Sequence, residues 1–84
     1  MITVKITSKY IGEKPKWYDK FIGETFECYP IISASETYTT FHLTEKGLQK
    51  LSLLKGSKSF AALIYPSNCK IIMVGNIPVK QIKL

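Results

Sequence analysis

Residues 17–29 read WYDKFIGETFECY, and this stretch decides how the rest of the chain is expected to fold. It contains the only tryptophan and five of the ten aromatic residues in a chain of 84. Each buried aromatic side chain removes about 150–250 Å² of surface from water, so a small domain forms its core around such a group. Gly23 stands where a turn would lead into a strand, because glycine tolerates the backbone angles of such turns. We therefore expect the core to form around residues 17–29.

Length and composition predict a single domain over residues 1–84. Hydrophobic residues make up 45% of the chain, which is more than a disordered chain carries. The longest apolar run, residues 60–65, is far shorter than the roughly 18 residues of a membrane span. The alternating N-terminus lacks the apolar region of a signal peptide. We expect a soluble, cytoplasmic protein with no membrane partner, and its oligomeric state, a dimer included, stays open.

Alternation and turn residues predict three strands in the first half of the chain. Residues 2–6 alternate between apolar and polar side chains, as a half-buried strand does. Residues 9–16 are expected to form a loop, because glycine and proline mark it. Residues 24–32 are expected to form a second strand that is broken or bulged at Pro30. Residues 37–43 are rich in β-branched and aromatic residues and are expected to form the third strand.

One helix is predicted over residues 44–55. Thr44 is a suitable N-terminal cap, and Gly56 is a suitable terminator. Three leucines at helical spacing form an apolar stripe that we assign to the core, while two lysines and Leu53 fall on the other side. The stripe consists of Leu48, Leu51 and Leu54, and the opposite lysines are Lys46 and Lys50.

Three further strands complete the chain. Residues 60–65 and 71–74 are nearly continuous apolar runs and are predicted to be central strands buried on both faces. The pair at residues 75–76 suits a two-residue turn, after which a last strand pairs back from Ile77, with a bulge near residues 80–81. This order favours the α+β class. We expect a small antiparallel or mixed sheet of about six strands that can curl into a barrel, with one helix between strands three and four.

The formal net charge of +6 is distributed unevenly. Residues 1–45 carry five lysines and six acids, whereas residues 46–84 carry seven lysines and no acid. Such asymmetry is typical of proteins with an anionic partner, most often nucleic acid. A solvated face that keeps the protein soluble is the alternative. Every basic residue is a lysine, which acts as a point charge, so we expect contacts to a phosphate backbone more than readout of bases.

Two groups of residues are candidates for nucleic-acid binding. Lysines of the basic half would neutralise phosphates. Lysines interleaved with aromatic residues over 9–20 have the composition of a platform on which single-stranded bases stack; the alternative for this segment is a loop folded over the core. The candidate residues are Lys46, Lys50, Lys55, Lys58, Lys70, Lys80 and Lys83, together with Lys14, Lys16 and Tyr18.

The sequence carries no catalytic or metal-binding pattern, so we expect a non-enzymatic protein without a cofactor. One histidine, His42, and two distant cysteines, Cys28 and Cys69, do not supply the spaced ligands of a zinc site. A nucleophile built from Cys28 and His42 would need a depressed thiol pKa, whereas cysteines on strands are usually buried and inert. We expect both cysteines to be structural and reduced.

Residues Trp17, Tyr18, Ile22, Gly23 and Phe26 form the pattern W-Y-x3-I-G-x2-F. It resembles a signature of small phage and bacterial proteins with SH3-like barrels, and this resemblance implies an SH3-like barrel here, from which the predicted helix departs. The size, the Lys/Ile-rich composition and the lack of arginine are similar to those of small early proteins of T-even phages. Some of those proteins inhibit host nucleases or toxin–antitoxin endoribonucleases, so the likeness implies a counter-defence role.

Two functions follow as hypotheses. The first is a non-enzymatic module that binds RNA or single-stranded DNA through lysine–phosphate contacts and aromatic stacking, as a phage regulatory or counter-defence protein would. The second is an antitoxin-like inhibitor that binds a host protein, such as a toxin–antitoxin endoribonuclease or another nuclease.

Overall fold

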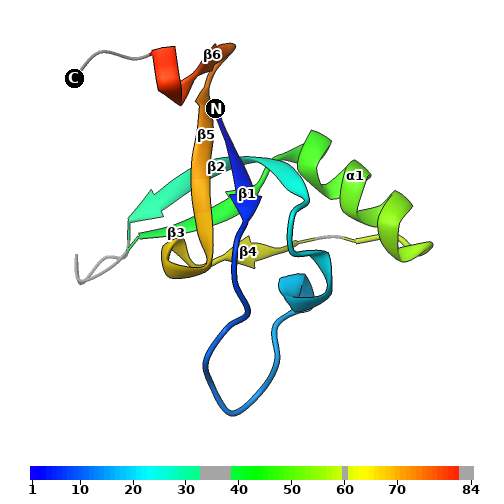
Figure 1. Cartoon of the computed structure of the whole chain (residues 1–84). Coiled ribbons are helices and arrows are strands. Elements are labelled where there is room, and N and C mark those ends of the chain that lie inside the picture. The colour runs from blue at the N-terminus through cyan, green and yellow to red at the C-terminus, as the bar shows by residue number, and fades with distance from the viewer. Residues whose placement is uncertain (33–38, 60, 82–84) are drawn as a thin grey trace.

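The computed structural model describes residues 1–32, 39–59 and 61–81, which form one six-stranded antiparallel sheet and one α-helix (Figure 1). Along the chain the elements are β1 (Ile2–Ile6), the 3-10 helix η1 (Trp17–Phe21), β2 (Thr25–Ile32), β3 (Thr39–Leu43), α1 (Glu45–Lys55), β4 (Leu63–Ile64), η2 (Pro66–Asn68), β5 (Cys69–Val74), β6 (Ile77–Pro78) and η3 (Val79–Gln81). Every strand pair is antiparallel. The α+β class and the predicted order of strands and helix are confirmed.

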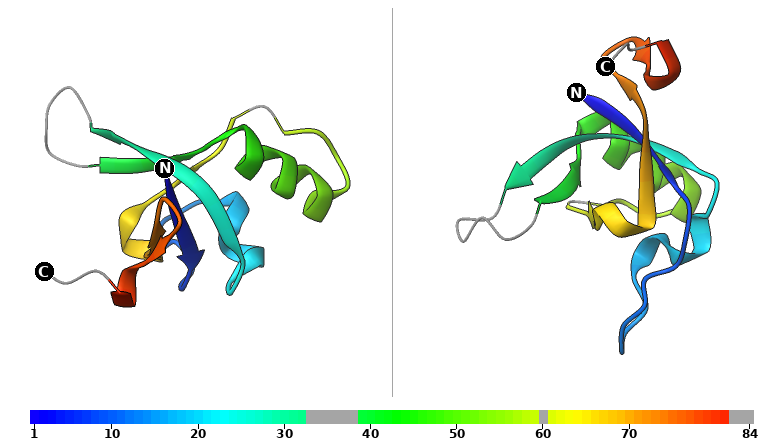
Figure 2. Two further views of the ribbon diagram at one scale, coloured as in Figure 1. Left: turned by 90° about the horizontal axis from the view of Figure 1, so that it is seen from above. Right: turned by 60° about the vertical axis from the view of Figure 1, so that its left-hand side comes forward.

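The sheet is curled but open. Its strand order is β4-β3-β2-β1-β5-β6. Residues 25–28 of β2 pair with β1, and residues 28–32 pair with β3, so β2 bends from one partner to the other (Figure 2). The edge strands β4 and β6 have two residues each and do not pair with one another among the described residues. With such short edge strands the sheet does not close into the expected barrel.

Helix α1 begins and ends where the sequence predicts. The Thr44 hydroxyl accepts the Gly47 N–H at 3.3 Å, and Gly56, with a φ of +72°, donates its N–H to the Ser52 carbonyl at 2.9 Å. Gly47 also allows the helix to approach the sheet, because a Cβ at this position would lie 2.5 Å from the Glu27 carbonyl oxygen. The first turn of α1 is therefore packed directly against the backbone of β2.

The apolar stripe of α1 is buried only in part. Leu51 is buried and Leu48 packs against the core, but the Leu54 side chain is 40% exposed. The expectation that Leu54 belongs to the core is wrong, because the last turn of α1 extends beyond the sheet (Figure 1). Leu53 is exposed, as predicted.

Within the described residues, no helix combines the length and the apolar character that crossing a membrane requires.

The core confirms the role of residues 17–29. Tyr18, Phe26 and Cys28 are buried in it, and Trp17 packs against it. Tyr18 donates its hydroxyl to the Asn68 side-chain oxygen at 2.6 Å, and burial raises the pKa of Tyr18 to about 12. The other buried apolar residues are Val4, Ile6, Phe41, Leu43, Leu51 and Ile64.

The two apolar runs in the second half do not form central strands buried on both faces. The run over 60–65 gives only β4, which lies at an edge of the sheet, and Phe60 lies outside the described residues. The run over 71–74 belongs to β5, which lies between β1 and β6, but no residue of β5 is fully buried. An apolar run indicates packing against a core, whereas the place of a strand in a sheet depends on distant partners.

The expected bulge at Pro30 is not formed. Pro30 lies opposite Phe41 with no shift of register between β2 and β3. Because β1 begins at Ile2, opposite Cys28, residues 29–32 of β2 pair with β3 alone among the described residues, and a residue without an N–H is tolerated there. The third strand is confirmed over Thr39–Leu43, while residues 37–38 lie outside the described part of the chain.

The C-terminal hairpin is confirmed, but it is shorter than expected. Gly75, with a φ of +59°, turns the chain, and β6 pairs back from Ile77. Residues 80–81 belong to η3 and form no bulge, because the chain leaves the sheet after two residues of β6. The register shift of this sheet lies instead between Thr3 and Val4, where β1 faces β5.

Candidate nucleic-acid interface

Three hollows near β4 share lining residues, and we refer to them together as the β4 groove. The first, of about 420 Å³, and the second, of about 330 Å³, share Trp17, Ala61 and Ala62. The second and the third, of about 570 Å³, share Tyr65. The described residues that line the groove are Lys16, Trp17, Thr39, His42, Leu51, Lys55, Lys58, Ser59, Ala61, Ala62, Leu63, Tyr65, Pro66 and Ser67.

Trp17 lies where the first hollow meets the second and is fixed there by the core. Its indole N–H donates to the Leu63 carbonyl of β4 at 2.8 Å. Its ring meets Tyr18 and Phe26 edge to face, with centroids 5.4 Å apart in each pair. The Leu63 carbonyl thus has an intramolecular partner, and Trp17 covers this part of the edge strand.

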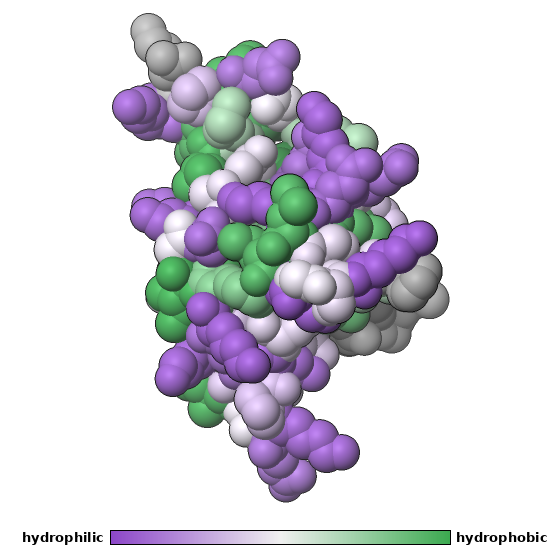
Figure 3. Space-filling view, turned by 90° about the vertical axis from the view of Figure 1, so that its right-hand side faces the viewer, coloured by the Kyte–Doolittle hydropathy of each residue, from purple (hydrophilic) through white to green (hydrophobic). Residues whose placement is uncertain are grey.

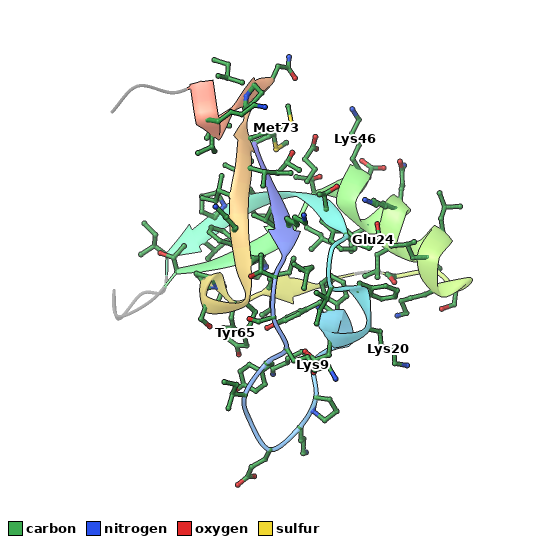
Figure 4. The ribbon with its side chains drawn as sticks, viewed as in Figure 1. Lys9, Lys20, Glu24, Lys46, Tyr65 and Met73 are labelled. Carbon is green, nitrogen blue, oxygen red and sulfur yellow. The ribbon has the colours of Figure 1, made fainter. Side chains whose placement is uncertain are left out.

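Tyr65 lies where the second hollow meets the third, beside the loop between β1 and η1. Tyr10 of that loop stacks on Tyr65 with ring centroids 5.3 Å apart and planes inclined by 24°. The Lys16 ammonium lies 4.7 Å from the centroid of Tyr10 and 5.3 Å from that of Tyr65. Figure 4 shows Tyr65 at the end of the sheet from which the loop with Lys9 extends.

Asp19 holds this loop in place. Its carboxylate accepts the backbone N–H of Tyr10 at 2.9 Å and that of Lys16 at 3.1 Å. Two segments of the loop are thereby tied to η1, which brings the Tyr10 ring and the Lys16 side chain to the end of the β4 groove. The loop packs on the core, as the second interpretation of residues 9–20 expects, and it also presents a half-buried ring and a lysine beside the groove. The stacking-platform interpretation stays a prediction.

The lining of the β4 groove is basic. Lys55 and Lys58 line the first hollow and Lys16 lines the second. None of the described residues that line the three hollows is an aspartate or a glutamate. Lysines beside aromatic rings in one groove are the composition that single-stranded nucleic acids require of a binding surface.

The structure thus brings together three of the predicted binding residues, but it corrects the expectation for Tyr18. Tyr18 has 0% exposure, and its hydroxyl is bonded to Asn68. A ring buried on all sides has no face on which a base can stack, so Tyr18 serves the core. Its neighbour Trp17 lines the groove instead.

Lys50 also differs from its predicted place, because its side chain is bound within the fold. Its ammonium donates to the Thr25 carbonyl at 2.6 Å and to the Thr25 hydroxyl at 3.2 Å. It forms an ion pair with Glu24 at 3.4 Å and lies 5.2 Å from the centroid of the Phe26 ring. Lys46 extends from the first turn of α1 away from the sheet (Figure 4). The two lysines therefore do not form one basic helix face.

The remaining predicted lysines lie elsewhere. Lys70 and Lys80 line a hollow of about 410 Å³ between β5 and η3, which we call the η3 hollow and which shares no residue with the β4 groove. Lys14 is exposed on the loop between β1 and η1. Lys83 lies outside the described residues.

Tyr65 and the alanines at 61–62 are groove residues that sequence reasoning missed. The apolar run that contains them indicates a buried strand, and nothing local shows that it lies at an edge. The one local signal is Pro66, which ends the strand directly after Tyr65. That Tyr10 would stack on Tyr65 depends on the tertiary fold, because the two residues are far apart in the chain.

The cysteines and the histidine have ordinary structural surroundings. Both cysteines are free, and burial raises the pKa of Cys28 to about 12 and that of Cys69 to about 11. A thiol with a raised pKa stays protonated and is a poor nucleophile at neutral pH. His42 lies with one ring nitrogen 3.0 Å from the Thr40 hydroxyl. Among the described residues, no three His, Cys, Asp or Glu residues form a group that could hold a metal ion.

A further hollow, of about 880 Å³, lies along α1. It is lined by one side of the helix, including Leu48 and Leu53, and by residues 56–59. Figure 3 shows this side of the molecule, where hydrophilic side chains are interspersed with hydrophobic ones. We call it the α1 hollow.

The described lining of the β4 groove combines lysines with aromatic rings, whereas the α1 hollow is lined mainly by leucine and serine side chains with one lysine, Lys58, and one acid, Glu45. Compared with known proteins, the chain matches no protein family, no curated protein and no solved structure.

Proposed function

We propose that this protein binds single-stranded nucleic acid, RNA or DNA, in the β4 groove and catalyses no reaction on it. The observation that carries this proposal is the combination of lysines and aromatic rings in a groove whose described lining has no acidic residue. Lys16 and Lys55 provide positive charge in different hollows of the groove, and Trp17 and Tyr65 provide ring surfaces. Phosphates would bind the lysines, and bases would stack on the rings.

The same features favour a single strand over a duplex and favour little sequence preference. Bases in a duplex are already paired and stacked, so they do not reach a ring at the protein surface. Stacking tolerates every base, because each base has a π face. Lysine adds a mobile point charge without the planar fork by which arginine reads guanine.

A protein partner is the second candidate, and the α1 hollow is the observation that favours it. Leu53, at 84% exposure, is an apolar side chain beside that hollow, where a partner could cover it. A host endoribonuclease toxin or another nuclease is the partner class that the phage likeness suggests. Strand addition at β4 is disfavoured, because Trp17 already occupies the Leu63 carbonyl.

The biological setting belongs to the same proposal. We infer a phage regulatory or counter-defence protein that acts in the host cytoplasm, on the basis of the compositional likeness to small early phage proteins. The W-Y-x3-I-G-x2-F pattern supports a relation between this open, curled sheet and SH3-like barrels, and that relation remains a prediction.

The test is binding of fluorescein-labelled oligothymidylate and oligouridylate, each of about 12 nucleotides, measured by anisotropy over a range of salt concentrations. Each phosphate contact should contribute about −0.7 to the log–log slope, so three groove lysines predict a slope near −2. The duplex of equal length should bind more weakly. An absence of binding at low salt, or equal binding of the duplex, would contradict the proposal.

A pull-down from host lysate with and without nuclease treatment distinguishes the two candidates. Under our proposal the protein co-purifies with nucleic acid, seen as a high ratio of absorbance at 260 and 280 nm, and nuclease removes the bound material. A host protein that stays bound after nuclease treatment would favour the inhibitor instead.

A further inference from the structure

The Lys16 ammonium occupies the surface of a ring pair that borders the β4 groove. It lies 4.7 Å from the centroid of Tyr10 and 5.3 Å from that of Tyr65, while the two rings stack on one another. Tyr65 borders the second and the third hollow, so this ring of the pair adjoins open space. Both rings are half-buried, and a ring that holds the protein's own cation is one that attracts ligands with affinity for a π face.

We propose that the Tyr10–Tyr65 ring pair is a site for one unpaired nucleotide, whose base displaces the Lys16 ammonium, and that the ammonium then binds the adjoining phosphate. This inference rests on the proposed function and deepens it, because it names the unit of the ligand and the groups that bind each part. The base contacts the rings, and the phosphodiester contacts Lys16.

The exchange requires little movement of the backbone. Asp19 holds the backbone N–H groups of both Tyr10 and Lys16, so the loop stays in place while the lysine side chain swings. The lysine stem is long and flexible, and its ammonium can move several ångströms by rotamer changes alone. The Asp19 carboxylate accepts these two backbone N–H groups, and Lys16 and Asp19 form no ion pair within 4 Å.

The balance of interactions favours the exchange when a nucleotide is present. At an exposed site a cation–π contact is weak, whereas stacking of a base on an aromatic side chain is stronger. The displaced ammonium gains a charge-assisted contact with phosphate, so it does not lose a partner. In the absence of nucleic acid the ammonium covers the rings, which keeps an apolar surface from water.

Nuclear magnetic resonance tests the displacement directly on the full chain. In the free protein the ε-methylene protons of Lys16 should be shifted upfield by the Tyr10 and Tyr65 rings. Saturation with an oligothymidylate of about 12 nucleotides should return them to ordinary lysine values. An unchanged upfield shift in the saturated complex would overturn the displacement of Lys16.

The base site is tested with an abasic oligomer of the same length, which keeps the phosphates and lacks the bases. Wild-type protein should prefer oligothymidylate to the abasic chain by about tenfold. Tyr65→Leu should reduce this preference, and stacking on Trp17 accounts for the part that remains, whereas Tyr65→Phe, which keeps the π face, should retain it in full. Lys16→Met should keep the preference and flatten the salt dependence by about 0.7 in slope.

The outcomes separate this inference from the proposed function. If the wild-type protein binds both oligomers equally with a steep salt dependence, the nucleic-acid function holds and the base site is wrong. If Tyr65→Leu keeps the preference in full, the base stacks elsewhere and the base site is also wrong. If the wild-type protein binds neither oligomer at low salt, the proposed function fails and the base site fails with it.

Discussion

The β4 groove and the η3 hollow both contain lysines, but they differ in what lies between those lysines. In the β4 groove, Lys16 and Lys55 accompany the rings of Trp17 and Tyr65. In the η3 hollow the other lining residues are aliphatic side chains and a proline. Lysines alone attract any polyanion, and salt screens that attraction, whereas rings add contacts that only an unpaired base can make. The basic charge of residues 46–84 therefore does not by itself locate a binding site.

Removing Trp17 should have the largest effect, and it should destabilise the protein much more than the matched change in the η3 hollow. Trp17→Ala removes a ring that packs on Phe26 and donates to the Leu63 carbonyl, and it should lower the free energy of unfolding by about 3–5 kcal/mol. The matched change in the η3 hollow, Val79→Ala, removes a partly exposed side chain and should cost less than about 1 kcal/mol. Urea unfolding measures both. Similar losses for the two variants would show that Trp17 is not an anchor of the groove.

The pH dependence of stability should report the burial of the two cysteines, one in the core on β2 and one on β5. Burial raises the pKa of Cys28 from 9.0 to about 12 and that of Cys69 from 9.0 to about 11. Because the thiols lose their protons first in the unfolded chain, stability should be full below about pH 9 and fall as the pH rises toward 11–12. Tyr18 contributes in the same direction, since its pKa rises from 10.0 to about 12.

Chemical unfolding at several pH values from about 8 to 11 checks this dependence. The free energy of unfolding should fall by up to about 1.4 kcal/mol per pH unit for each titrating group. Cys28→Ala and Cys69→Ala should each flatten the loss, and by similar amounts, because both thiols stay mostly protonated in the folded chain until about pH 11. A variant that leaves the slope unchanged, or a wild-type stability that rises in this range, would contradict the burial of that thiol.

Lys50 differs from the lysines of both hollows, because its side chain is bound within the fold. Lys50→Met removes the hydrogen bonds to Thr25 and the ion pair with Glu24, and it should lower the free energy of unfolding by about 1 kcal/mol. Lys46→Met, on the same helix, should stay within about 0.5 kcal/mol of the wild type. Thermal unfolding of the two variants measures the difference. A Lys50 variant as stable as the Lys46 variant would return Lys50 to the set of surface lysines.

The parts of the fold that were predicted correctly depend on signals close together in the chain. Thr44 and Gly56 mark the two ends of α1 by the hydrogen bonds that each makes within the helix. The alternation over β1 and the turn at Gly75 are equally local. In each of these elements the residues that specify the structure are the residues that form it.

The parts that were missed depend on contacts between distant segments. Whether a strand lies at the centre or the edge of a sheet is decided by its partners, and among the described residues β4 pairs with β3 alone. Aromatic and lysine residues alternate over 9–20, but that pattern does not indicate that Tyr18 points into the core and Trp17 toward the groove. Lys16 and Lys55 border one groove only because Trp17 of η1 contacts β4 and also lines one hollow with the end of α1.

Affinity for a single strand, compared between two pairs of lysine substitutions, tests the central claim most directly. Lys16→Glu with Lys55→Glu changes the β4 groove, and Lys70→Glu with Lys80→Glu changes the η3 hollow by the same charge. Circular dichroism establishes that both variants fold, and anisotropy with labelled oligothymidylate measures their affinity. The groove variant should bind about tenfold more weakly or worse and show a flatter salt dependence, whereas the η3 variant should lose less than about threefold. Equal losses in the two variants would contradict the claim that the β4 groove is the binding site.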